Sequence, residues 1–148
     1  GAYRLLDAGS GDGPTVQIAA SGATVPEALA AAAELADEGI RAHVIDVTSV
    51  DRLYAAWQRT LRQGIRTATT PSVAGALRQA FDFSAPIVTV HDAASHAMAW
   101  LGSALGVPAV SLGVDSFGQS GRVADLYAAH DLDQGSIVNA ALAALALR

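Results

Sequence analysis

Hydrophobic positions along this chain follow two spacings, one typical of strands and one typical of helices. Short runs rich in apolar and β-branched residues predict strands at residues 2–6, 15–20, 42–47, 86–91 and 109–114. Apolar residues at helical spacing predict helices at 24–38, 50–63, 71–80, 95–105, 123–130 and 137–147. Strands and helices therefore alternate from residue 16 onward, which predicts a largely parallel sheet with helices on both faces.

The expected fold is α/β: a three-layer α/β/α domain with about five strands in a mixed sheet, mostly parallel with an antiparallel first strand. Residues 7–14 are rich in turn formers, and so short a loop favours antiparallel pairing between strands 2–6 and 15–20. A length of 148 residues suits one domain, and no linker or internal repeat divides it. Residues 1–148 are therefore expected to form a single domain.

Local signals place the ends and the buried faces of two helices. Thr24 followed by Glu27 matches a capping box, and Gly39 stops that helix. Its predicted buried face contains Leu29, Ala32 and Leu35. The next helix is expected to bury Trp57 and Leu61 together with either Leu53 or Tyr54, and to end at Gly64.

Composition narrows the possible partners. The chain is 51% hydrophobic and 16% charged, as globular proteins are, and it has no cysteine, which excludes disulfides and thiolate metal sites. Its net charge is −5, and all nine basic residues are scattered arginines. The loose group Arg52, Arg59, Arg62 and Arg66 is interpreted as a solvated helix face, so no nucleic-acid partner is expected. No signal peptide or membrane-spanning run is apparent, which predicts a cytoplasmic protein without a membrane partner.

Two glycine-containing segments are candidates for anion binding. Residues 9–13 lie between two predicted strands, where a dinucleotide fingerprint is not expected, so they are interpreted as a turn. Ser21, Gly22 and Thr24 instead lie between a strand and a helix, where free backbone N–H groups favour a small anion. An ordinary capped helix start is the competing interpretation.

Catalytic and metal-binding patterns are weak. His91, Asp115 and Ser120 follow predicted strands and could meet at the carboxyl edge, but Ser120 lacks the glycine spacing of a hydrolase elbow. The four histidines show no metal-ligand spacing; they are His43, His91, His96 and His130. No catalytic, cofactor-binding or metal-ligating residue is therefore assigned.

Several motifs together resemble one enzyme family. Residues 1–5 look like the junction at which the enzymes of this family enter their final domain. Residues 16–22 are similar to a strand of the same enzymes that leads into a Gly-Ser-Gly-like turn. Residues 47–53 are similar to a Val-Thr-Ser-Phe-x-x-Leu stretch, and residues 114–120 to Thr-Asp-Gly-Phe-Gly-x-Ser. The whole chain thus resembles the C-terminal domain of the homodimeric pyruvate dehydrogenase decarboxylating component, in the transketolase-like thiamine diphosphate superfamily. The chain departs from that family's pattern in two places. Ser116 stands where the family usually has Gly, and the Asn-x-Leu-His-Pro sequence that follows the Trp of the family, here Trp57, is lacking.

The resemblance implies a non-catalytic domain of a larger oxidoreductase of glycolytic metabolism. Thiamine diphosphate and Mg²⁺ would sit between upstream domains of a homodimer, with none in this domain. The lack of an initiator Met agrees with an excised piece. Implied partners are the upstream thiamine-binding domains, the second subunit and the acetyltransferase component. A surface for an anion or a partner is expected at Ser21, Gly22, Thr24, Asp115, Phe117 and Ser120.

Three alternatives stay open at this point. The chain could be the C-terminal domain of a transketolase or of another 2-oxo acid dehydrogenase, since these enzymes share the Phe-Gly-x-Ser feature. It could be a freestanding module that binds a small anion at residues 21–24, or a hydrolase that uses Ser120.

Overall fold

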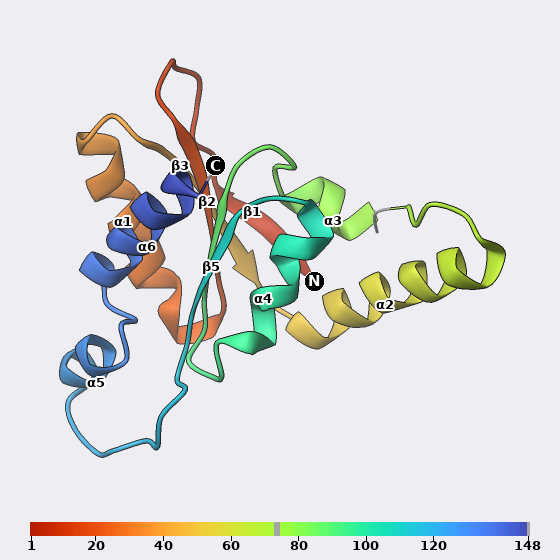
Figure 1. Ribbon diagram of the computed structural model, residues 1–148. Helices are drawn as coiled ribbons and strands as arrows, with labels where there is room; N and C mark the ends of the chain where they lie inside the picture. The colour runs from red at the N-terminus through yellow and green to blue at the C-terminus, as the bar shows by residue number, and fades with distance from the viewer. Residues whose placement is uncertain (73–74, 148) are drawn as a thin grey trace.

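The predicted five-stranded mixed sheet and its two helical layers are confirmed (Figure 1). The computed structural model describes residues 1–72 and 75–147. In this part of the chain the strands are β1 (Ala2–Leu6), β2 (Thr15–Ala20), β3 (Arg41–Val47), β4 (Ile87–Val90) and β5 (Ala109–Leu112). The helices are α1 (Val25–Asp37), α2 (Val50–Thr67), α3 (Gly75–Ala80), α4 (His96–Leu105), α5 (Val123–Ala129) and α6 (Gln134–Ala146), with a 3₁₀ turn η1 (Gly22–Thr24). The helix predicted over 71–80 includes residues 73–74, which lie outside the described residues.

The strand order is β1-β3-β2-β4-β5, with β2, β3, β4 and β5 parallel to one another. From β2 the chain moves to one side to form β3 and then crosses to the other side to form β4. The strand order therefore reverses between β2 and β4. In open α/β sheets, ligands bind outside the carboxyl ends of the strands at such a reversal.

The antiparallel first strand is confirmed, but the hairpin predicted for it is wrong. β1 pairs with β3, with Ala2 opposite Val47, and not with β2. Tight hairpins use loops of two to five residues, whereas eight residues separate β1 from β2. The longer loop lets β1 pass β2 and close the free edge of β3.

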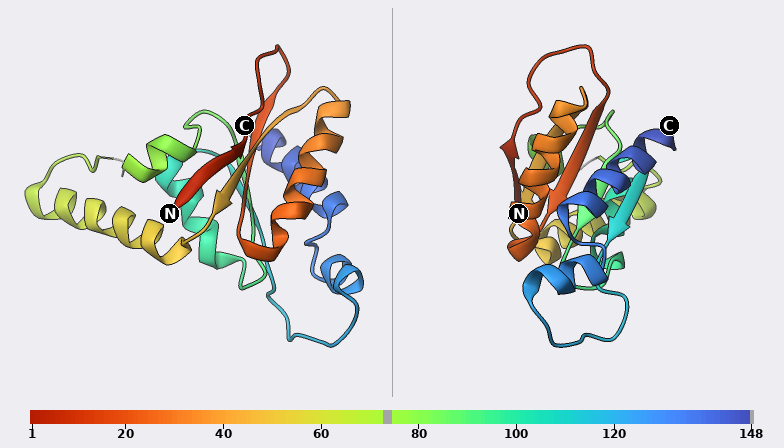
Figure 2. Two further views of the ribbon diagram at one scale, coloured as in Figure 1. Left: turned by 180° about the vertical axis from the view of Figure 1, so that it is seen from behind. Right: turned by 90° about the vertical axis from the view of Figure 1, so that its left-hand side faces the viewer.

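Two helical layers cover the two faces of the sheet (Figures 1 and 2). Helices α1 and α6 pack on one face, over the alternate β2 residues Val16, Ile18 and Ala20. Helices α3 and α4 pack on the other face, where Ala19 and Ile87 meet Leu77, Met98 and Leu101 among others. The four parallel strands thus contribute to both cores, as expected of parallel strands buried on both sides, whereas β1 contributes only Ala2, to the second core.

The capping box predicted at the start of α1 is not formed. The Thr24 side chain makes no capping bond to α1, and Glu27 Oε2 instead accepts the backbone N–H of Gln134, 2.9 Å away. Glu27 therefore caps α6, a helix more than a hundred residues further along the chain. The buried face of α1 is shifted from the predicted one: Ala32 and Leu35 are buried as expected, Ala28 and Ala31 are buried as well, and Leu29 is 37% exposed.

Helix α2 extends away from the three-layer body (Figures 1 and 2). It continues to Thr67, so the predicted end at Gly64 is wrong. A Cβ on Gly64 would lie 2.8 Å from the Thr69 carbonyl oxygen and 2.9 Å from Pro71 Cγ. Gly64 therefore lets the returning chain pack against the helix from within it. Of the predicted stripe, Leu53 is buried, whereas Trp57 and Leu61 are half-buried.

Candidate functional site

The predicted site residues lie in two loops at the carboxyl edge of the sheet. Ser21, Gly22 and Thr24 directly follow β2, beside the reversal in strand order. Asp115, Phe117 and Ser120 lie in the loop between β5 and α5. In the sheet, β4 stands between β2 and β5. The structure therefore places the two groups at one edge but does not bring them together as one cluster.

The hydroxyl groups of the first loop hold the ends of strands. Ser21 Oγ donates to the Val47 carbonyl at 2.8 Å, which ties β2 to β3. Thr24 is fully buried, and its Oγ1 lies 3.0 Å from the Ser21 carbonyl oxygen and 3.2 Å from that of Val90. These hydroxyls donate to backbone carbonyls, so the side chains of Ser21 and Thr24 hold strand ends, and anion binding by the backbone of this loop stays a prediction. Gly22 is exposed, and its φ of 63° lies in the left-handed region that glycine adopts without strain.

Asp115 has a structural role at the start of α4. Its Oδ1 accepts the backbone N–H of Ser95 at 2.9 Å, one of the free donors at that helix start. Hydrogen bonding from Ser95, first from its hydroxyl and then from its amide, holds the pKa of Asp115 below its ordinary value. A Cβ on Gly113 would clash with Ala93 and Ser95. A glycine at position 113 is therefore what allows this close approach.

The loop between β5 and α5 is exposed and carries one aromatic ring, that of Phe117. Every residue from Asp115 to Asp125 is exposed, and Phe117 is 100% exposed. An apolar side chain held so far from the core marks a contact surface more often than a catalytic group. The hydrolase arrangement is not assembled in the described residues, because no hydrogen bond reaches Ser120 there. Ser116 Oγ, not Ser120, lies 3.5 Å from a histidine ring, that of His130.

A small hollow of about 210 Å³ lies beneath this loop. Its polar members include Asp92, Tyr127 and His130. The Tyr127 hydroxyl donates to the Ala23 carbonyl at 3.2 Å and so links α5 to η1. Burial, and then the charges of Asp92 and Glu27, raise the pKa of Tyr127. Nothing in the local sequence pattern around Tyr127 indicates its partner Ala23, which lies 104 residues away along the chain.

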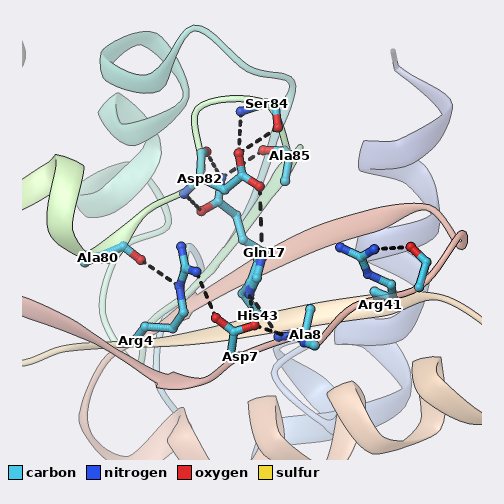
Figure 3. A network of polar contacts seen from close by, with 12 residues as sticks. Arg4, Asp7, Ala8, Gln17, Arg41, His43, Ala80, Asp82, Ser84 and Ala85 are labelled. Carbon is cyan, nitrogen blue, oxygen red and sulfur yellow. Dashed lines mark hydrogen bonds and ion pairs between the residues drawn. The ribbon is translucent and has the colours of Figure 1, made fainter.

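At the opposite edge, a largely buried polar network joins residues of β2, β3, the β1–β2 loop and the segment before β4 (Figure 3). The Gln17 side chain donates to the carbonyl oxygens of Asp82 and Ala85 at 2.6 and 2.8 Å, and its Oε1 accepts the Asp82 N–H at 3.1 Å. His43 Nδ1 accepts the Ala8 N–H at 3.0 Å. Each bond spans 35 residues or more, which is why the sequence pattern gave no sign of them.

These geometries give the His43 ring a defined protonation state. Since Nδ1 accepts a hydrogen bond, a neutral ring carries its proton on Nε2, which lies 3.9 Å from Asp82 Oδ2. Burial, and after it the charge of Arg4, lowers the pKa of His43 below its ordinary value. The ring is therefore a neutral tie between the β1–β2 loop and β3.

The described residues do not fit a magnesium–diphosphate cofactor. Among the described residues, no three His, Cys, Asp or Glu side chains gather in one place. Asp115, the acid of the loop after β5, accepts a hydrogen bond from a helix start, and the two hydroxyls after β2 donate to strand carbonyls. No chemical step is therefore derived through such a cofactor in this domain. In the same part of the chain, no helix combines the length and hydropathy needed to cross a bilayer.

The fold is a three-layer α/β domain with a mixed five-stranded sheet. The chain belongs to the family of transketolase-like C-terminal domains, whose family model, described as the transketolase-like TK C-terminal domain, matches residues 1–133. A comparison with curated proteins found no matching sequence.

Solved transketolases share this fold. A split-gene transketolase described as an inactive β4 tetramer is 25% identical, with a TM-score of 0.61 over 92% of this chain and 41% of that one. The Leishmania mexicana transketolase is 25% identical, with a TM-score of 0.64 over 99% of this chain and 18% of that one. A Pichia stipitis transketolase in complex with xylulose 5-phosphate is 19% identical, with a TM-score of 0.66 over the same shares. The chain thus spans less than half of the length of each of these proteins.

Proposed function

We propose that this chain is the non-catalytic C-terminal domain of a thiamine diphosphate-dependent enzyme of the pyruvate dehydrogenase type. In this proposal, upstream domains of a larger cytoplasmic homodimer hold thiamine diphosphate and Mg²⁺ and decarboxylate a 2-oxo acid. The domain supports assembly with those upstream domains and with the second subunit. Its exposed loop meets a partner, such as the acetyltransferase component.

One observation carries the proposal. At the carboxyl edge, the polar groups predicted to form a site are largely engaged in holding strand and helix ends, whereas Phe117 is fully exposed. The polar residues at this edge stabilise the fold, and the loop exposes an aromatic ring. Such an arrangement suits binding to another protein surface better than it suits catalysis. The resemblance of residues 47–53 to a Val-Thr-Ser-Phe-x-x-Leu stretch favours the pyruvate dehydrogenase type, whereas the Phe-Gly-x-Ser feature is shared with transketolases.

A transketolase C-terminal domain is the second candidate, favoured by the family match and by the fold of the solved transketolases. The two candidates differ only in what the upstream domains do. The full-length protein would turn over pyruvate with lipoamide in the first case and transfer two-carbon units between sugar phosphates in the second.

Calorimetry tests the non-catalytic role directly. Thiamine diphosphate with Mg²⁺, titrated into the 148-residue chain, should release no binding heat, because the described acids and hydroxyls are not arranged to hold it. Saturable binding with one site per chain would contradict the proposal. The activity of the full-length protein toward pyruvate or toward xylulose 5-phosphate then separates the two candidates.

A further inference from the structure

The outer part of α2 carries arginines that the fold leaves without acidic partners. Arg59, Arg62 and Arg66 are exposed and share one helix face, being three and four residues apart. None of them makes an ion pair within residues 1–72 and 75–147. Helix α2 also contains Arg52 and Asp51, so its formal net charge is +3. Since the whole chain has a net charge of −5, the residues outside α2 together carry −8.

Beside the arginines, α2 presents apolar side chains. Ile65 is 78% exposed and lies one helical turn from Arg62, and Leu61 is half-buried one turn before Ile65. A helix with a basic strip next to an apolar strip fits a groove that is apolar inside and acidic at its rim.

A groove of this kind lies on another part of the same domain. It has a volume of about 440 Å³ and runs between α1 and the β1–β2 loop. Its apolar lining includes Leu6 and Leu29, which are 40% and 37% exposed, as well as Ile40. An apolar floor this open to solvent indicates a contact surface.

The rim of the groove is acidic. Asp37 and Glu38 follow directly after the lining residue Ala36, and Asp12 lies between two lining glycines. All three acids are exposed, and none makes an ion pair with any described residue. The one positive charge in the lining, Arg41, bonds the Gly11 carbonyl and leaves the rim acidic overall.

The basic helix and the acidic groove cannot meet within one copy. The groove lies beside α1 on one face of the sheet, whereas α2 extends from the other side (Figures 1 and 2). We propose that α2 of one copy docks into the groove of a second copy of this chain. Leu61 and Ile65 enter the apolar floor, and the arginines face Asp37 and Glu38. Each copy therefore offers one donor surface, α2, and one acceptor surface, the groove.

The occupant is a second copy because both complementary surfaces are on this chain. With −8 outside α2, two copies repel each other in most orientations, and the approach of α2 to the groove is one that opposite charges favour. The proposal rests on these two surfaces and not on the thiamine chemistry proposed above, so its failure would leave that function untouched.

Sedimentation equilibrium from micromolar to millimolar concentration tests the contact with two charge-reversal variants. One variant changes the helix, Arg59→Glu with Arg62→Glu, and the other changes the groove, Asp37→Lys with Glu38→Lys. The wild type should associate reversibly and more weakly as salt rises. Each variant alone should show a dissociation constant raised by at least about tenfold. An equimolar mixture should recover association, because the basic helix of the groove variant still fits the acidic groove of the helix variant.

Two further variants isolate the contact from general charge effects. Arg122→Glu reverses an exposed arginine that belongs to neither surface, and it should raise the dissociation constant by much less than tenfold. Ile65→Ala removes an exposed apolar side chain without a change of charge and should weaken association. Three results would overturn the proposal: a wild type that stays monomeric at low salt, association insensitive to both reversals, or a mixture that fails to recover it. If the chain stays monomeric, α2 and the groove would instead be contact surfaces for upstream domains or for other proteins.

Discussion

Gln17 shows how much a single buried polar side chain contributes at the residue scale. It is fully buried in β2, and its amide satisfies two carbonyl groups and one N–H of the segment before β4. We expect Gln17→Leu to lower the free energy of unfolding by about 2–4 kcal/mol, because it leaves those backbone groups unpaired. Gln79→Leu, at an exposed position of α3, should change it by less than about 0.5 kcal/mol. Urea denaturation of both variants measures the difference, and equal effects would contradict this role.

His43 gives the domain a pH dependence whose sign is fixed by burial. Its pKa is lowered in the folded state, whereas in the unfolded chain it has the ordinary value of about 6.5. As pH falls below about 6.5, the unfolded state binds the proton first, so stability falls with pH until the folded pKa is passed. Above the unfolded pKa, this contribution to stability is complete.

Urea midpoints between pH 5 and 8 measure this slope. His43→Gln should flatten the slope in that window, and His96→Gln, at an exposed position, should leave it unchanged. The pKa values of Asp7 and Asp82 are also lowered, so these carboxylates change the stability only in a separate window, near and below pH 4. An unchanged slope in His43→Gln would show that another group sets the pH response.

Residue-scale roles are where the sequence was least informative. The core positions Ala32, Leu35 and Leu53 follow from helical spacing and are confirmed. The partners of Gln17 and Glu27 could not be inferred, because the bonds that bury them join segments 65 or more residues apart. A local sequence pattern indicates which residues favour burial. It does not indicate which polar group, distant in the sequence, will form a hydrogen bond with them.

At the scale of elements, the sequence predicted the kind and order of the helices and strands well and their ends less well. Strand β1 was placed correctly but paired wrongly, because loop length decides between a hairpin and a longer path. Helix α2 runs past Gly64 because that glycine serves packing against residues 69–71 and not helix termination. A glycine in a helical pattern has the same local signature in both roles.

Gly64 and Gly75 therefore make a matched pair for a test. In an exposed helix, Gly→Ala normally stabilises by up to about 1 kcal/mol. Gly64→Ala should instead destabilise by about 1–3 kcal/mol, since its Cβ would overlap the Thr69 carbonyl and the Pro71 ring. Gly75→Ala meets no atom within 4 Å and should be neutral or stabilising. Thermal denaturation compares the two, and a stabilised Gly64→Ala would contradict the packing role.

At the scale of the whole molecule, the fold was predictable because its signals repeat along the chain. Alternating strands and helices fix a layered α/β domain whichever single helix end is misplaced. The candidate site was less predictable, since strand ends can be located from the sequence but the partners of their polar side chains cannot. Thr24 and Asp115 lie where they were expected, yet they serve the backbone.

The last helix provides the test of the molecule as one unit. The family match ends at residue 133, just before α6. Yet α6 buries Ile137, Val138 and three alanines against α1 and the sheet, and its first residue is held by Glu27. The large apolar side chains of a helix like this contribute about 1.5–3 kcal/mol each, against a net stability of about 5–15 kcal/mol for a domain.

Deletion of residues 134–148 should therefore abolish cooperative folding, although the whole family-matched segment remains. The exposed core under α1 should bind a hydrophobic dye, and near-ultraviolet circular dichroism should be lost. Deletion of residues 147–148 is the control, because Leu147 is 63% exposed and should contribute little. If the chain ending at residue 133 unfolded cooperatively with wild-type stability, α6 would be an appendage. The domain would then consist of the family-matched segment alone.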